Sequence, residues 1–533
     1  MDRYDVVIVG SGFGGAVMAC RLAEAGRRVL VLERGREWTP ETYPRGPGDA
    51  WVWDNDDPAK NNGWIDMRRF PDMTVVQGAA VGGGSLIYAN VSIEAKPFVF
   101  ETGWPSEITY DRLKPHYDTV GEMLNVQELP DSQLTERFKL MREAANAAGH
   151  GERFQKVELA VTFDKSWHYG LDDATSDHHS KTWQNAHGKT QGTCVHCGNC
   201  DIGCQVSAKN TLDLNYLARA RDCGAEIRAN HLVRSLVPLD DDAYEIQFDR
   251  IENGDLVPGR VIGDRAVLAA GSLGSTELLL RCRDEHRTLR NLSSRLGHGW
   301  CSNGDFLTPA LYSNRMISPT RGPTITCAID FLDGSQEGNR FFVEDGGFPD
   351  VIGNSWQDVT QTIASGAGQL ATMFTRMGEL AEDSDPLSCV MPWFGQAVDA
   401  PDGQMTLGRP WWNPFAKRSL RLDWDVSRSE AVVSAMIAMH KELSEKTGGF
   451  PVEPLSWQLF RDLVTPHPLG GCCMSDDPAS GVVDANGRVF GHPNLYVVDG
   501  AIMPRAIGLN PSRTIAALAE HVAEQMVINW DVH

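Results

Sequence analysis

Four cysteines lie within one short stretch of the chain, CVHCGNCDIGC. Their spacing, CxxCxxCxxxC, is the one with which bacterial ferredoxins hold iron and sulfur. The proline that follows the last cysteine in ferredoxins is missing, because Gln205 stands there. Three interpretations are open: an iron–sulfur cluster, a structural zinc ion, or reduced cysteines buried in a glycine-rich turn. The cysteines are Cys194, Cys197, Cys200 and Cys204, and His168, His178, His179, His187 and His196 lie near enough in sequence to keep zinc open.

A second chemical pattern stands near the N-terminus, where GSGFGG follows an apolar run. Gly10, Gly12 and Gly15 fit GxGxxG: the first glycine allows a tight turn, the second lets backbone approach a pyrophosphate, and the third lets a helix pack on a strand. Glu33 ends the next apolar run, where an acidic residue accepts from a ribose hydroxyl and disfavours a 2′-phosphate. The pattern predicts a strand, a glycine turn, a helix and a strand that bind a dinucleotide.

Two further segments predict backbone that approaches the same ligand closely. Residues 82–84 are three consecutive glycines before Ser85. Without side chains, such a segment lets a planar ring or a phosphate lie directly against backbone amides. Residues 265–280 show a buried strand, a turn of small residues and the start of a helix.

The C-terminal region contains a fourth segment of this kind. Leu495 to Val498 reads as a buried strand that ends at Asp499 and Gly500. Pro511 opens a helix that runs through Ala516, Ala519 and Val522, with Asn510 at its N-cap. The N-terminus of that helix offers a fixed partial positive charge to a cofactor.

Composition excludes several classes of protein. The 533 residues are 42% hydrophobic and 23% charged, which is ordinary for a globular enzyme and unlike a disordered or coiled-coil chain. With 49 basic and 71 acidic residues, the net charge of −22 argues against nucleic acid or anionic lipid as a partner. No apolar run approaches the roughly 20 residues of a transmembrane helix, and no secretory signal is visible. Twelve cysteines are too few for a disulfide scaffold, so we expect a cytoplasmic protein.

Between these segments the pattern changes to tryptophan, proline and short alternating runs. Residues 340–344 and 419–424 are examples, and they predict half-exposed antiparallel strands. The chain shows no internal repeat and no low-complexity linker. We therefore expect one body in which a second domain is discontinuous in sequence.

Five motifs agree in content and order with one known family. They are GSGFGG with Glu33, GAAVGGGSL, AAGSLGSTELLL, HPLGG, and VVDGAIMP followed by GLNPSRTIAALAE. Together they resemble the glucose-methanol-choline flavoprotein oxidoreductases, most of all their cholesterol oxidase branch, over most of the chain. The resemblance implies an α/β fold, in which a Rossmann-like FAD-binding domain is interleaved with an α+β substrate domain built on an antiparallel sheet. The FAD-binding domain would comprise residues 1–100, 190–310 and 465–533, and the substrate domain residues 101–189 and 311–464.

The resemblance also implies which residues bind FAD. They come from the glycine-rich turns and from the C-terminal strand and helix. The set is Gly10, Gly12, Phe13, Gly14, Gly15, Glu33, Gly82, Gly83, Gly84, Ser85, Asn90, Ala270, Gly271, Asp499, Gly500, Asn510 and Pro511.

The family's paired catalytic residues fall on His467, in HPLGG, and on Asn510. A neutral imidazole suits the removal of a hydroxyl proton, and an amide can hold the substrate oxygen without titrating. FVEDGGFP resembles the strand that carries the substrate-facing glutamate of cholesterol oxidases, which would be Glu344, with Asp345 as a close rival. A buried glutamate there could move a steroid double bond, and its pKa should be raised. The segment WCSNG, with Asn303, resembles the WxxNG motif of sterol oxidases.

The sequence therefore predicts FAD-dependent oxidation of a hydroxyl on a bulky apolar alcohol, by hydride transfer to flavin N5. The best single guess for the substrate is a 3β-hydroxysteroid, with oxygen or another electron acceptor as the second partner. One alternative is a dehydrogenase of the same fold with a non-oxygen acceptor, which an iron–sulfur cluster would favour. The others are an FAD-containing hydroxynitrile lyase without redox cycling, and a non-enzymatic redox sensor built on flavin and the cysteines.

Overall fold

The glycine-rich N-terminal segment folds into strand β1 (Arg3–Val9), helix α1 (Phe13–Glu24) and strand β2 (Val29–Leu32), as its pattern predicts. The two strands pair in parallel. All of β2 is buried, which explains its continuous apolar sequence. The turn between β1 and α1 requires Gly10, which has φ of +96° and where a Cβ atom would collide with the backbone of Ala269.

The computed structural model describes residues 1–46, 48–313, 315–349, 388–409, 413, 415–452 and 463–530. Within these residues the first sheet has seven strands in the order β11-β2-β1-β14-β13-β12, with β24 also paired to β14. Strands β11, β2, β1, β14 and β24 run parallel, and the β12–β13 hairpin extends the sheet in antiparallel fashion. The additional strands are β11 (Glu226–Arg228), β12 (His231–Pro238), β13 (Tyr244–Glu252), β14 (Asp255–Leu268) and β24 (Leu495–Val497).

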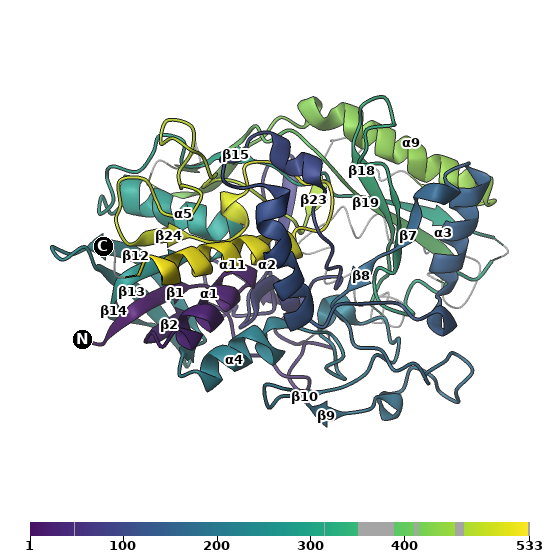
Figure 1. The fold of residues 1–533 in the computed structure, drawn as a ribbon, viewed down its shortest axis with the longest axis horizontal. Coiled ribbons are helices and arrows are strands. Elements are labelled where there is room, and N and C mark those ends of the chain that lie inside the picture. Colours follow the sequence, from purple (N-terminus) through teal and green to yellow (C-terminus); the bar gives the residue numbers. More distant parts are fainter. Residues whose placement is uncertain are drawn as a thin grey trace.

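Helices pack against this sheet and against one another. Helix α1 contacts α4 (Tyr216–Asp222) and α11 (Ser512–Ile528), and α11 in turn contacts α2 (Tyr110–Met123). Figure 1 shows the yellow α11 beside the purple α1, with α2 crossing it. Helix α5 (Gly271–Asp284) follows β14 and contacts β12. Because α1 and α5 both begin where parallel strands end, their N-termini meet at one edge of the sheet.

A second sheet carries the other half of the molecule. Its six described strands are ordered β22-β16-β19-β18-β17-β7 and are all antiparallel. Helices α3 (Glu136–Ala147) and α9 (Glu430–Lys446) contact each other and this sheet, at the right of Figure 1. The strands are β7 (Phe154–Lys156), β16 (Phe306–Leu311), β17 (Cys327–Asp330), β18 (Phe341–Asp345), β19 (Val390–Ala397) and β22 (Phe450–Pro451).

Smaller elements complete the described residues. One small sheet joins β23 (Leu463–Thr465), β5 (Met73–Gly78), β4 (Ile65–Arg69) and β3 (Val52–Trp53), and another joins β15 (His298–Trp300), β20 (Gly403–Gly408) and β21 (Ser419–Asp423). Two-stranded sheets pair β6 (Gln127–Glu128) with β8 (Glu158–Leu159) and β9 (Trp183–Gln184) with β10 (Thr190–Gln191). The 3-10 turns are η1 (Gly83–Leu86), η2 (Pro97–Glu101), η3 (Asp131–Gln133), η4 (Gly151–Arg153), η5 (Asp177–His179), η6 (Cys200–Ile202), η7 (Leu212–Leu214), η8 (Val426–Ser429) and η9 (Gly500–Ile502).

The predicted fold class is confirmed: a Rossmann-like α/β unit is combined with a unit built on an antiparallel sheet. The strands of the first sheet all come from ranges assigned above to the FAD-binding domain. In the second sheet, β16 begins at Phe306, just before the substrate-domain range that starts at 311. The division of the chain into domains at these boundaries stays a prediction. Within the described residues, no helix is both long and apolar enough to cross a membrane.

Candidate active site

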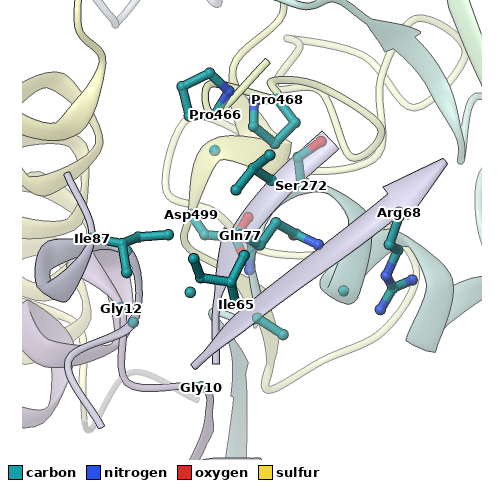
Figure 2. A pocket seen from close by; sticks show the side chains of 18 of the residues that line it. Gly10, Gly12, Ile65, Arg68, Gln77, Ile87, Ser272, Pro466, Pro468 and Asp499 are labelled. Atoms are coloured by element: carbon teal, nitrogen blue, oxygen red, sulfur yellow. The ribbon is translucent and has the colours of Figure 1, made fainter. Parts of the chain in front are cut away.

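A cavity of about 1300 Å³ extends from the N-terminal glycine turn to the antiparallel sheet. Gly10, Gly12 and Glu33 line it in the Rossmann-like unit, and His467 and Asn510 line it near the second sheet. In the view of Figure 2, Pro466 and Pro468, which flank His467, lie at the top, and Gly10 and Gly12 lie lower. The volume exceeds the roughly 300–1,000 Å³ of a pocket for one drug-sized ligand, so the cavity has room for a dinucleotide and a substrate together.

The glycines of the N-terminal motif divide into those that pack against protein and those that face the cavity. A Cβ atom at Gly14 would collide with the carbonyl of Val498, and one at Gly15 with the carbonyl of Gly10. By contrast, a Cβ atom at Gly12 or at Gly84 would meet nothing within 4 Å, and both residues line the cavity. Bare backbone facing open space is the cradle that a pyrophosphate requires, so these residues fit FAD.

This division predicts different outcomes for two similar substitutions. Gly12→Ala should fold normally but bind FAD at least about tenfold more weakly, because the new methyl group occupies the cradle. Gly14→Ala should instead unfold at lower temperature, because its methyl group collides with backbone. Fluorescence titration of the apoprotein with FAD and thermal unfolding distinguish the two effects. If Gly12→Ala binds FAD with wild-type affinity, Gly12 does not form part of the FAD cradle.

Glu33 lies at the end of β2 and organises the turn. One carboxylate oxygen accepts hydrogen bonds from Ser11 N (2.9 Å) and Ser11 Oγ (2.7 Å), and the other accepts from Gly35 N (2.9 Å). Ser11 Oγ also accepts from Gly82 N at 3.0 Å, which joins the two glycine-rich turns. The carboxylate keeps lone pairs for a ribose hydroxyl. Ser11 was not singled out from the sequence, since a serine between two glycines has no distinguishing pattern.

Asp499 fastens the start of α5 to the C-terminal turn. Its carboxylate accepts from Gly271 N (2.9 Å), Ser275 Oγ (2.5 Å) and Ala501 N (2.8 Å). Burial raises the pKa of Asp499 to about 6, and these hydrogen bonds oppose the rise. The carboxylate therefore holds the backbone that surrounds the cavity.

Most residues assigned above to FAD line the cavity. Those that do are Gly10, Gly12, Phe13, Gly14, Glu33, Gly83, Gly84, Ala270, Gly271, Asp499, Gly500, Asn510 and Pro511, whereas Gly15, Gly82, Ser85 and Asn90 lie outside its lining. Ser85 Oγ instead donates to Gly82 O at 2.7 Å and shapes the triple-glycine turn. Asn90 is fully buried with φ of +70°. Its side-chain amide has no hydrogen-bond partner among the described residues. The individual contacts to FAD stay predictions.

His467 is held by a buried carboxylate from the other half of the molecule. Its Nδ1 lies 2.8 Å from Asp305 Oδ1, and Asp305 Oδ2 accepts from Thr465 Oγ1 at 2.5 Å. Thr465 Oγ1 in turn accepts from the backbone N–H of His467 at 2.8 Å. Burial raises the pKa of Asp305, and His467 opposes that rise. A carboxylate on Nδ1 favours the tautomer in which Nε2 is free to accept a proton.

Neither Asp305 nor Thr465 was singled out from the sequence. Asp305 follows the WCSNG segment by one residue, and Thr465 stands two residues before His467. We predict that Asp305→Asn slows flavin reduction at least about 100-fold without weakening FAD binding, because an amide can present its NH₂ to Nδ1 and stabilise the wrong tautomer. Anaerobic stopped-flow absorbance would measure this, with Thr465→Ser, which keeps the hydroxyl, as the conservative control. If Asp305→Asn reduces the flavin at a near-wild-type rate, Asp305 does not orient His467.

Asn510 is positioned by the WCSNG segment. Asn303 Oδ1 accepts from Ile507 N and Gly508 N, both at 3.0 Å, and its Nδ2 donates to Leu509 O at 2.9 Å. Three hydrogen bonds from one buried side chain thus shape the loop that immediately precedes Asn510. Asn510 lines the cavity. Its Oδ1 atom is buried and accepts no hydrogen bond from the described residues. Such an atom fits a partner supplied by the substrate or the flavin.

The structure separates Glu344 from its rival Asp345, because neighbouring side chains of β18 point to opposite faces. Asp345 pairs with Arg137 at 3.0 Å and accepts from Thr326 Oγ1 at 2.5 Å. Glu344 is fully buried and is not among the residues that line the cavity, and one of its oxygens accepts from Gln396 Nε2 at 2.8 Å. Burial raises the pKa of Glu344 to about 8, and contacts with Gln396 and Asn510 oppose the rise.

The second-sheet end of the cavity is mainly apolar. Its walls near His467 and Asn510 include Phe306, Leu307, Ile325, Phe348 and Phe394. These side chains come from strands of the antiparallel sheet or from the loops beside them. A bulky apolar molecule would bury its surface here at a favourable free energy of about 25 cal/mol per Å².

None of the four clustered cysteines forms a disulfide bond within the described part of the chain. Backbone N–H groups donate to two of the sulfurs, from His196 to Cys194 at 3.4 Å and from Ala208 to Cys204 at 3.2 Å. Within the described residues, no three of the four sulfurs lie within 4.8 Å of one another. A closed tetrahedral zinc site would hold them about 3.8 Å apart. Both metal interpretations of Cys194, Cys197, Cys200 and Cys204 stay predictions.

Comparison with known proteins identifies the class. Residues 399–519 match the family model described as GMC oxidoreductase, and residues 8–42 match an NAD(P)-binding Rossmann-like domain. A cholesterol oxidase of Acinetobacter baumannii is 30% identical over 97% of this chain and 93% of its own length, and one of Mycobacterium tuberculosis is 32% identical over 98% and 90%. In structure, pyridoxine 4-oxidase from "Mesorbium loti" covers 98% of both chains with a TM-score of 0.63 at 19% identity, a likeness of fold.

The fold, the FAD cradle and the histidine–carboxylate pair thus define a flavoprotein that oxidises alcohols. The chain belongs to the glucose-methanol-choline (GMC) oxidoreductase family, in its cholesterol oxidase-like branch, and is an FAD-dependent oxidoreductase acting on alcohol donors. The sequence-based prediction of the family is confirmed.

Proposed function

We propose that the protein oxidises the 3β-hydroxyl of a steroid to a ketone and then shifts the neighbouring double bond. The observation that carries this proposal is the position of Glu344, a fully buried carboxyl group that contacts Asn510 as well as Gln396. Simple alcohol oxidation needs a base for one hydroxyl proton only, and His467 serves it. A second proton acceptor suits a substrate with an acidic C–H next to its new ketone.

The chain's own groups have separate tasks in this proposal. Bound FAD supplies the acceptor for the hydride that leaves the carbinol carbon. Nε2 of His467 takes the hydroxyl proton while Asp305 stabilises the resulting imidazolium, and the side-chain NH₂ of Asn510 donates a hydrogen bond to the substrate oxygen. The carboxylate of Glu344 then removes a proton from the carbon between ketone and double bond and returns it to the far end of the double bond. The net result is one ketone, one moved double bond and no further change in oxidation state.

Oxygen is the electron acceptor that we propose. The two relatives of 30–32% identity are both named as cholesterol oxidases, which supports oxygen over a protein or quinone acceptor. The apolar walls of the second-sheet end, including Phe306, Phe348 and Phe394, support a bulky apolar substrate.

Anaerobic absorbance spectra of the purified holoenzyme test the proposal. A 3β-hydroxy-Δ5-steroid should bleach the flavin bands, whereas the matched 3α-epimer, which presents its carbinol hydrogen to the wrong side, should leave them unchanged. After air is admitted, one hydrogen peroxide should form per ketone. Bleaching by a long-chain primary alcohol but by neither steroid would discard the steroid and leave alcohol oxidation intact. Bleaching without peroxide formation would mean that the electron acceptor is not oxygen. Turnover without any bleaching would favour the FAD-containing hydroxynitrile lyase.

A further inference from the structure

Three potential metal ligands meet between helices α2 and α11, away from the cavity lining. They are His116 on α2 and His521 and Glu524 on α11, and their ligand atoms all lie within 4.8 Å of one another. His521 and Glu524 are three residues apart, so one helical turn places them on the same face. Figure 1 shows α2 crossing α11.

We propose that His116, His521 and Glu524 bind a divalent transition-metal ion, Zn²⁺ or a similar ion, that links α2 to α11. His521 is 1% exposed, and neither of its ring nitrogens has a hydrogen-bond partner, although the Ala485 carbonyl faces the ring. A buried imidazole without a partner is costly unless a further group completes it. Metal-ligating histidines commonly direct their second nitrogen toward a carbonyl or a carboxylate, and the backbone of Ala485 is such a group beside this ring.

The other two ligands are close and adjustable. His116 Nε2 lies 3.8 Å from Glu524 Oε2, and the side chains are 13% and 51% exposed. The rings of His116 and His521 meet edge to face, with centroids 5.8 Å apart. Tetrahedral coordination requires ligand atoms about 3.3 Å apart, so the three side chains must move closer together by up to about 1.5 Å to complete the set. The partly exposed face leaves coordination positions for water.

The chemistry of the three groups selects the kind of metal. An imidazole is mainly neutral at neutral pH, and burial disfavours its charged form, so both histidines can ligate there. Two imidazoles and one carboxylate suit Zn²⁺, Co²⁺ or Ni²⁺, whereas Mg²⁺ and Ca²⁺ prefer oxygen ligands alone. Arg112, one turn before His116, is a nearby cation that opposes binding, and Glu520 and the net charge of −22 favour it.

Equilibrium dialysis of the chelator-treated holoenzyme against Zn²⁺ tests this site. Because the four clustered cysteines can also take up zinc, the informative quantity is the difference between variants. Wild type should bind one equivalent more than His116→Ala, and Glu524→Gln should weaken that equivalent at least about tenfold. An exposed residue outside both groups of potential ligands supplies the matched control: Glu122→Gln, also on α2, should bind zinc like wild type.

Thermal unfolding provides a second measurement. Zn²⁺ should raise the melting temperature of wild type more than that of His116→Ala, because an ion that binds only the folded state stabilises it. Mg²⁺ should raise neither. Equal zinc stoichiometry and affinity in wild type, His116→Ala and Glu524→Gln would overturn the proposal, as would equal thermal shifts in all three proteins. Since both substituted side chains are partly exposed, these variants should fold.

Discussion

Flavin reduction by the alcohol should slow by about 10²–10⁴-fold when His467 is replaced by alanine. The Nδ1 atom of His467 is held by Asp305 at 2.8 Å, so the ring is oriented before the substrate arrives and its Nε2 atom is the base facing the cavity. Alanine removes that base but touches none of the glycines that line the cofactor end. The oxidised flavin spectrum and the FAD affinity should therefore stay unchanged. Anaerobic stopped-flow absorbance with excess substrate measures the rate.

Two comparisons make the His467→Ala result specific. His178→Ala, at an exposed histidine outside the cavity lining, should reduce at the wild-type rate. His467→Ala combined with Asp305→Asn should be scarcely slower than His467→Ala alone, because Asp305 acts through the histidine. Additive losses in the double variant would mean that Asp305 works independently. An unchanged rate in His467→Ala would remove the histidine from the mechanism.

Glu344→Gln should leave the oxidation of a 3β-hydroxy-Δ5-steroid close to its wild-type rate but slow the double-bond shift at least about 100-fold. Glutamine keeps the size of the side chain and a hydrogen-bonding partner for Gln396, but it cannot remove a proton from carbon. The unconjugated ketone should accumulate, and chromatography of the products would separate it from the conjugated ketone. Asp345→Asn is not a suitable control, because it would break the buried pair with Arg137.

The pH dependence of the double-bond shift provides an independent measure of Glu344. Burial raises its pKa to about 8, so the carboxyl is mostly protonated at neutral pH and the basic form gains population as pH rises. The shift should accelerate about tenfold per pH unit below 8 and level off above it. Wild-type product ratios in Glu344→Gln, or a shift that slows as pH rises through 8, would contradict the assignment.

The cofactor part of the molecule was predictable because its signals are local. Gly10, Gly12 and Glu33 lie within one strand–turn–helix–strand segment, and each residue type follows from backbone geometry that the segment itself creates. Even so, the sequence did not distinguish Gly12, which faces the cradle, from Gly14, which packs on Val498. That difference depends on Val498, which lies 484 residues farther along the chain, directly after β24.

The catalytic part was predictable only where a motif carried it. His467 and Asn510 were identified by resemblance, but Asp305 lies 162 residues from His467 and joins it only through the packing of β16 against β23. Glu344 and Asp345 could not be separated from the sequence, because both faces of β18 are buried and alternation offers no polar side to choose. The salt bridge from Arg137 to Asp345 supplies the missing information.

By itself, the sequence determined the cofactor class, the family and the alternation of parallel and antiparallel regions, since glycine turns and apolar runs act over a few residues. The tertiary structure decided which carboxylates serve chemistry and which serve packing. It directed Asp305 and Glu344 toward the cavity residues His467 and Asn510, committed Asp345 to Arg137, and placed His116 beside His521. The physical reason is that a buried charge takes its role from the partners that folding brings to it, and those partners are distant in the chain.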